Sequence, residues 1–158
     1  MSLYRRILVP VDDSSPAQAG LHTAIAMAQD QQATLKLIAV ANEASKDYQG
    51  GELGWINSQG LGERIKSDTE VSLDKAVAQA EAAGLAPERE VIVALDEQVG
   101  RHITQAAVDW QADLIVIGTH GRHGLSLWMM GSTTETLLHG LNLPLLVVPG
   151  TQKETDDA

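Results

Sequence analysis

The sequence predicts a doubly wound α/β fold, with a five-stranded parallel sheet and helices on both of its faces. Short apolar segments of strand length alternate along the chain with segments whose apolar residues recur every three or four positions. Strands that alternate with helices in this way run parallel, because each helix returns the chain to the starting end of the sheet. The expected strands are residues 7–11, 35–41, 90–95, 114–117 and 143–148.

The expected helices each present one apolar face. The first begins at Ser14-Ser15-Pro16, which supplies a cap and a first-turn proline. Its apolar face is formed by Ala17, Leu21, Ala24, Ile25 and Ala28. The second helix has the same spacing over residues 73–80 and ends before Gly84, and the third covers residues 99–110.

The length of 158 residues favours one domain, because two hydrophobic cores need a longer chain. We expect this single domain over residues 1–150 and a short acidic tail over residues 151–158. Residues 42–60 have no clear periodicity and include four glycines, so we expect a long loop there. A functional flap and plain disorder both remain open for this loop.

Composition and charge exclude several classes of protein. The net charge of -10 repels a phosphate backbone, which makes nucleic acid an unlikely partner. The absence of cysteine excludes disulfides, thiolate metal sites and thiol nucleophiles. Neither a signal peptide nor an apolar run long enough to cross a membrane is visible, so we expect a cytoplasmic protein.

A glycine-rich stretch after the fourth expected strand is the most informative feature. Gly118 and Gly121 follow the strand, and Gly131-Ser132 leads into a helical pattern. Glycines allow the backbone to approach a ligand closely, and the start of a helix directs N–H groups and a positive dipole end at an anion. This arrangement predicts a phosphate-binding loop and therefore a nucleotide.

Asp12 follows the first expected strand, as the glycine stretch follows the fourth. Ligands of open α/β sheets bind beyond the carboxyl ends of the strands, where neighbouring connections leave toward opposite faces. The Asp12 carboxylate can accept hydrogen bonds from a ribose there. We therefore expect Asp12 and the glycine stretch to face one another.

At these residues the chain resembles the ATP-binding branch of the universal stress protein family, whose signature is Gly-x2-Gly-x9-Gly followed by Ser or Thr. Gly118, Gly121, Gly131 and Ser132 match every position of it. Residues 7–12 and 143–148 resemble the first and last strands of the family, and the resemblance covers about residues 3–149. It implies the sheet order 3-2-1-4-5 and an adenine nucleotide alpha hydrolase-like fold.

The resemblance also implies a set of binding residues. Asp12 would contact the ribose, and the Val40 backbone would recognise adenine. The two glycines nearest the strand would line ribose and phosphates, and the second half of the signature would hold the terminal phosphates of ATP, with Mg²⁺ arriving on the nucleotide. The implied set, together with an arginine that could offset phosphate charge, is Asp12, Val40, Gly118, Gly121, Arg122, Gly131, Ser132 and Thr133.

Structural roles compete with these assignments. Ser132 begins a capping box with Glu135, and an isolated pair of glycines is usually a turn. Asp12 can serve the dipole of the first helix, and Arg122 can be solvated. His120 and His123 lie three residues apart, but a third ligand for zinc is missing nearby. The sequence at residues 128–130, Trp-Met-Met, is typical of core or a subunit contact.

The last strand is bracketed by Pro144 and Pro149, which is typical of a sheet edge. In the family this strand pairs with its copy, so the resemblance implies a homodimer, with a covered monomer edge as the alternative.

Three functions remain open: a nucleotide-binding regulatory protein in the stress response, a slow ATP hydrolase with a histidine base, and a dimeric scaffold that binds no nucleotide. The first is favoured, because the usual nucleotide hydrolase, kinase and esterase motifs do not occur. We expect no catalytic residue and no resident metal.

Overall fold

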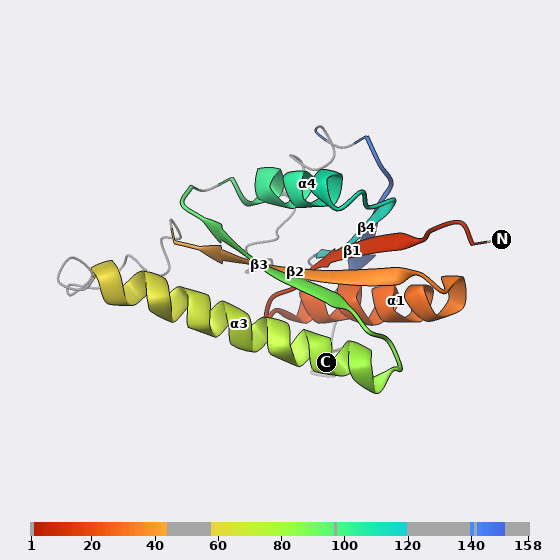
Figure 1. Ribbon diagram of the computed structural model, residues 1–158, viewed down its shortest axis with the longest axis horizontal. Coiled ribbons are helices and arrows are strands. Elements are labelled where there is room, and N and C mark those ends of the chain that lie inside the picture. The colour runs from red at the N-terminus through yellow and green to blue at the C-terminus, as the bar shows by residue number, and fades with distance from the viewer. Residues whose placement is uncertain (1, 44–57, 97, 120–139, 141, 151–158) are drawn as a thin grey trace, which may run out of the picture.

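Five parallel strands form one sheet in the order β3-β2-β1-β4-β5, which confirms the predicted fold and strand order. The computed structural model describes residues 2–43, 58–96, 98–119, 140 and 142–150. The strands are β1 (Arg6–Pro10), β2 (Thr34–Asn42), β3 (Glu88–Ala94), β4 (Leu114–Thr119) and β5 (Leu145–Pro149). The arrowheads of β1, β2 and β3 point the same way in Figure 1. The last strand lies at an edge of the sheet, as its prolines indicated.

Helices cover both faces of the sheet (Figure 1). Helices α1 (Ser15–Gln31) and α3 (Ser58–Ala82) lie on one face, and α4 (Val99–Asp109) lies on the other. All the apolar positions predicted for the three helix faces are buried. In the part of the chain that the structure describes, no helix is both long enough and apolar enough to cross a bilayer.

Helix α1 begins where the sequence predicts. Ser14 is extended and caps the helix, because its Oγ accepts a hydrogen bond from the N–H of Ala17 at 3.3 Å. Pro16 occupies the first turn, where a missing N–H has no cost. The helix ends at Gln32, which adopts the left-handed conformation with φ of 54°.

Helix α3 corrects the prediction for residues 42–60. Asn42 is the last residue of β2, and Ser58–Ala82 form one helix of 25 residues, so the helix expected from residue 73 begins much earlier. Its first half escapes a periodicity argument because Ile65 is the one apolar side chain described as buried between residues 60 and 72. Residues 44–57 lie outside the described residues, and so does the predicted tail at 151–158.

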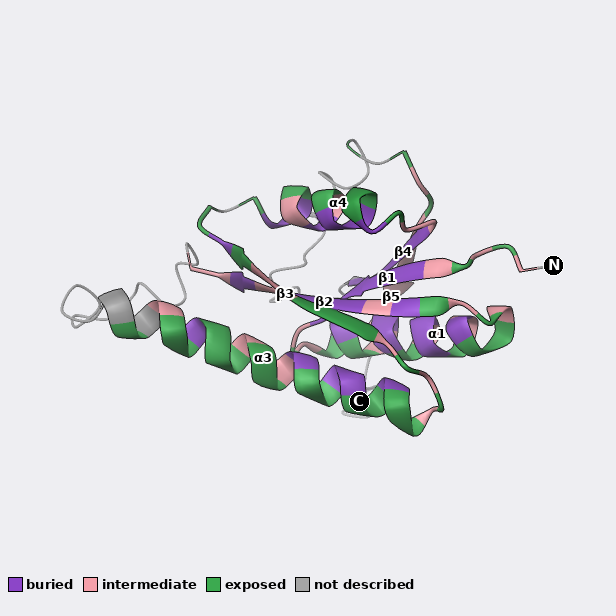
Figure 2. Cartoon of the chain, viewed as in Figure 1, coloured by how far each residue is buried: buried purple, intermediate pink, exposed green. Residues whose placement is uncertain are grey.

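The core has two layers because strand side chains alternate between the faces of the sheet. Ile7 and Val9 of β1 pack with α1 and α3, whereas Leu8 packs against α4. All three side chains are fully buried. Figure 2 shows this buried sheet between helices whose outer sides are exposed. The centre of the sheet therefore fixes the positions of the strand ends.

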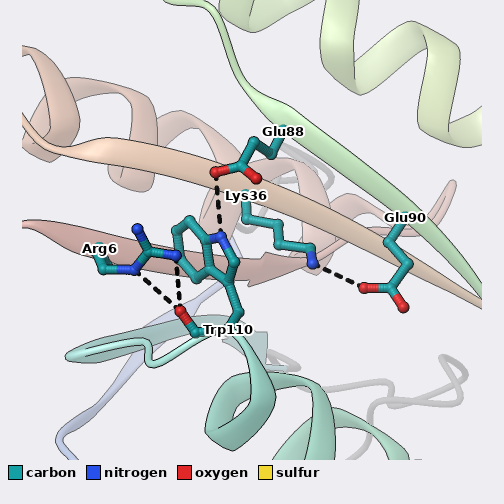
Figure 3. A network of polar contacts seen from close by, with 5 residues as sticks. All are labelled: Arg6, Lys36, Glu88, Glu90 and Trp110. Atoms are coloured by element: carbon teal, nitrogen blue, oxygen red, sulfur yellow. Dashed lines mark hydrogen bonds and ion pairs between the residues drawn. The ribbon is translucent and has the colours of Figure 1, made fainter.

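Charged side chains close the amino end of the sheet on the α4 face (Figure 3). Trp110, just after α4, lies under the Arg6 guanidinium at 4.1 Å, and its carbonyl accepts hydrogen bonds from Arg6 Nε and Nη2 at 2.9 and 2.7 Å. Its indole N–H donates to Glu88 at 3.1 Å, and Lys36 pairs with Glu90 at 2.8 Å. We call these five residues the Trp110 network. It ties β1, β2 and β3 to the end of α4.

Candidate functional site

The carboxyl ends of β1 and β4 mark the point where the connections between strands change from one face of the sheet to the other. Helix α1 leaves β1 on one face, and α4 leads into β4 on the other. The register of β1 with β2 covers residues 6–10, whereas that with β4 covers two pairs, Ile7 with Leu114 and Leu8 with Ile115. A ligand crevice in an open α/β sheet forms at such a point, beyond the carboxyl ends of the strands.

Asp12 lies at this point, in the turn between β1 and α1. The N–H of the preceding residue, Val11, still donates to the carbonyl of Ile38 at 2.8 Å, so the chain follows the sheet up to Asp12. Its Oδ1 accepts a hydrogen bond from the N–H of Ser14 at 2.7 Å, which closes a turn of the Asx type. The carboxylate is therefore held beside the strand end by a local turn bond, whereas the first turn of α1 contains no acidic residue.

Val40 lies in β2, next to the end of β1. In the register of the two strands, Pro10 is opposite Ile38, and continuing it by two residues places Val40 level with Asp12. On the other side Val40 pairs with Ile92 of β3, and its side chain packs against the core under α4. The main chain of Val40 therefore adjoins the Asp12 turn just beyond the last β1–β2 pair.

Gly118, in β4, completes the described part of the site. The register of β1 with β4, continued from Ile7 and Leu114, places it level with Val11. A Cβ at Gly118 would overlap the carbonyl of Pro16 and lie 2.9 Å from the nitrogen of Ala17. Glycine is required here for the packing of α1 on β4, and only the main chain of Gly118 can face a ligand. The sequence argument did not foresee this role.

The structure thus brings Asp12, Val40 and Gly118 to neighbouring positions on three adjacent strands. The other predicted binding residues lie outside the described residues and stay predictions; they are Gly121, Arg122, Gly131, Ser132 and Thr133. The same holds for His120, His123 and residues 128–130.

A second carboxylate, Asp96, follows the end of β3 in the same way, and the sequence argument missed it. Its Oδ1 accepts a hydrogen bond from the N–H of Gln98 at 3.0 Å and lies 3.0 Å from Nε2 of His102 in α4. The Gln98 N–H, and then the hydrogen bond with His102, lower the pKa of Asp96 below its ordinary value of 3.8. An aspartate directly after a strand was the signal used for Asp12, and it would also have found Asp96.

Comparison with known proteins places this chain in a family. The model of the universal stress protein family matches residues 3–149. A universal stress protein from Methanocaldococcus jannaschii is 29% identical over 153 residues, which are 97% of this chain and 86% of that protein. One from Synechocystis is 31% identical over 153 residues, 92% of this chain and 97% of the relative.

Solved structures share the fold. A hypothetical protein solved as a test case of structural genomics has a TM-score of 0.74 at 23% identity, covering 94% of this chain and 98% of its own. An Arabidopsis thaliana family member with AMP bound has a TM-score of 0.65 at 12% identity, covering 97% and 96%. A universal stress protein in complex with cAMP has a TM-score of 0.64 at 19% identity, covering 95% and 100%. Because the family model matches residues 3–149 of its 158 residues, the chain belongs to the universal stress protein family.

Proposed function

We propose that this protein binds an adenine nucleotide at the carboxyl ends of β1 and β4 and acts as a regulatory protein in the stress response. The observation that carries the proposal is that Asp12, Val40 and Gly118 lie toward the carboxyl ends of three adjacent strands, beyond the last β1–β4 pair. A carboxylate, strand backbone beyond the last β1–β2 pair and the start of a glycine-rich loop suit ribose, adenine and phosphate.

The adenosine part of the ligand fits the described residues. The Asp12 carboxylate has two oxygens, each of which can accept more than one hydrogen bond, so it suits recognition of ribose hydroxyls as well as the bond from the Ser14 N–H. The main chain of Val40 lies level with it and offers both a donor and an acceptor to an adenine edge. Asp12 follows β1 and Val40 lies in β2, and both strands are largely buried, so the fold holds both groups in place.

The phosphates would bind on the β4 side of the proposed site, away from Val40. In the first turn of α1, the N–H of Ser14 is bonded to Asp12, that of Ala17 is bonded to the Ser14 hydroxyl, and Pro16 has none. The N–H groups of Ser14 and Ala17 are consequently bonded within the chain, and Pro16 has no N–H to offer a phosphate. Phosphate oxygens would therefore be held by the predicted loop that begins at Gly118, where main-chain N–H groups and Arg122 would offset the net charge of -10.

Two similarly folded proteins hold AMP and cAMP, which supports an adenine nucleotide as the ligand class. For this chain we propose ATP as the ligand, with Mg²⁺ carried on its phosphates, because the glycine signature matches every position of the one in the ATP-binding branch that the chain resembles. We also propose a cytoplasmic homodimer in which β5, at the sheet edge, pairs with its copy. Light scattering on the purified protein tests the dimer.

The ligand is tested by denaturing the purified protein, identifying the released small molecules by mass spectrometry, and titrating the emptied protein with ATP, ADP, AMP and cAMP. We expect ATP to be released and to bind most tightly. Released ADP or AMP alone, with ATP turned over in solution, would identify a slow hydrolase instead. No released nucleotide and no heat of binding with any of the four would leave the scaffold function. A Gly131→Val variant, which crowds the predicted phosphate loop, should lose ATP binding.

A further inference from the structure

Helix α1 touches the end of β4 through two glycines, one on each element. Both Gly20 and Gly118 are buried. A Cβ at Gly20 would lie 2.8 Å from the nitrogen of Gly118 and 3.3 Å from its Cα. At Gly118, a Cβ would overlap the carbonyl of Pro16, one turn earlier in α1. The two main chains therefore approach each other more closely than any side chain would allow.

Gly20 is unfavourable for the helix in which it lies. It lies inside Ser15–Gln31, where alanine would stabilise the helix more because glycine loses more backbone freedom on folding. A glycine in a helix interior therefore requires a packing reason. The distance of 2.8 Å to Gly118 supplies it, since ordinary van der Waals contact begins at 3.4 Å and the atom in the way belongs to the backbone, which cannot rotate aside.

The contact at Gly20 joins the two strand ends of the proposed site. The amino end of α1 is bonded to Asp12 through the N–H of Ser14, so a shift of the helix moves the Asp12 turn. Gly118 begins the glycine signature, so a shift of its nitrogen moves the start of the predicted phosphate loop. A side chain at Gly20 must shift one of the two, and either shift changes the separation between them.

We propose that Gly20 is a positioning residue for nucleotide binding. It lets α1 lie against the backbone of Gly118 and so fixes the gap between the Asp12 turn and the start of the glycine loop, without touching the ligand. This inference rests on the proposed function and adds to it a residue outside the glycine signature that the ligand does not reach.

The test compares two substitutions on one face of α1. Gly20→Ala adds a methyl group against Gly118 and favours the helix, whereas Ala24→Gly, one turn later and fully buried, removes a methyl group and disfavours it. For each protein, ATP affinity is measured by calorimetry and the melting temperature without ligand by circular dichroism. We expect Gly20→Ala to weaken ATP binding by about tenfold or more. Ala24→Gly should melt at a lower temperature than the wild type and bind ATP within about twofold of it.

An ATP affinity of Gly20→Ala within twofold of the wild type would overturn the inference and leave the proposed function standing. Equal losses of affinity in both variants would also overturn it, because the effect would then follow helix stability. A wild-type protein that binds no adenine nucleotide would overturn the proposed function and this inference together.

Amide NMR on the wild type gives a second measurement that needs no variant to fold. ATP should shift the amide signal of Gly20 as well as that of Gly118, whereas the amide of Ala24 should hardly move. A Gly20 signal that stays in place while Gly118 responds would contradict the coupling.

Discussion

The two ends of the sheet treat their polar side chains differently. At the amino end, the Trp110 network pairs charged groups from three strands with one another and with the end of α4 (Figure 3). At the carboxyl end, Asp12 and Asp96 bond to the main chain of the turns that follow their strands, at Ser14 and Gln98. One end therefore joins elements of the fold, and the other shapes turns beside the point where β1 and β4 stop pairing.

This difference separates stability from binding. Groups at the amino end form hydrogen bonds and an ion pair with one another. Their removal should lower the free energy of unfolding and leave the affinity for a ligand at the far end of the strands unchanged. The Asp12 carboxylate at the carboxyl end is held by a short local bond, so a conservative change there should alter ligand affinity more than stability. Substitutions at Trp110, Gly118, Asp12 and Asp96 test this separation, in decreasing order of the change that we expect.

Trp110→Ala should have the largest effect. The side chain is 8% exposed, and its loss leaves a cavity under Arg6 and removes a partner of Glu88. We expect the free energy of unfolding in urea to fall by about 3 to 5 kcal/mol. Trp110→Phe keeps an aromatic ring and loses the indole N–H, so it should cost about 1 kcal/mol from that bond. ATP affinity should be unchanged in any variant that remains folded; a selective loss of affinity would contradict the separation of the two ends.

Gly118→Ala should follow, because its new Cβ overlaps the carbonyl of Pro16. Forcing α1 and β4 apart should cost about 1 to 3 kcal/mol of stability, as overpacking does. Urea unfolding of the ligand-free protein measures this cost. If the variant lost ATP binding at unchanged stability, Gly118 would act on the ligand alone and the packing role assigned to it would be wrong.

Asp12→Ala should weaken ATP binding by about tenfold or more, since hydrogen bonds to a charged acceptor contribute about 1.5 to 3 kcal/mol. Asp12→Asn can still accept the bond from the Ser14 N–H and should preserve stability while losing the charge. Ser14→Ala is the matched control. It removes the α1 cap at a cost of about 1 kcal/mol and leaves every predicted ligand contact in place. A Ser14→Ala affinity reduced as much as that of Asp12→Ala would attribute the effect to the turn.

Asp96→Asn should have the smallest effect, a change in stability that is visible at acidic pH. Because its folded pKa lies below the ordinary value of 3.8, its charged form stabilises the fold above that value, and this stability is lost as the pH falls through the folded pKa. The stability difference between the wild type and Asp96→Asn, measured in urea, should shrink as the pH falls below 3.8. A difference that grows as the pH falls below 3.8 would contradict the sign.

The sequence could predict features that depend on local patterns. Periodicity located the buried faces of α1 and α4, and an aspartate after a strand located Asp12. The first half of α3 gave no such pattern, because Ile65 is its one apolar side chain described as buried before residue 73. The Trp110 network and the contact between Gly20 and Gly118 join residues that are far apart in the chain. Such contacts depend on how closely elements approach, which composition and spacing do not encode.

The central claim is that an adenine nucleotide lies at the carboxyl ends of β1 and β4. A crystal structure of the protein grown with excess ATP and Mg²⁺ tests it most directly. The account predicts adenine beside the main chain of Val40, ribose within hydrogen-bond distance of Asp12, and phosphates on the loop that starts at Gly118. A nucleotide bound elsewhere on the molecule, with the Asp12 carboxylate and the Val40 backbone contacting only their own chain, would contradict it.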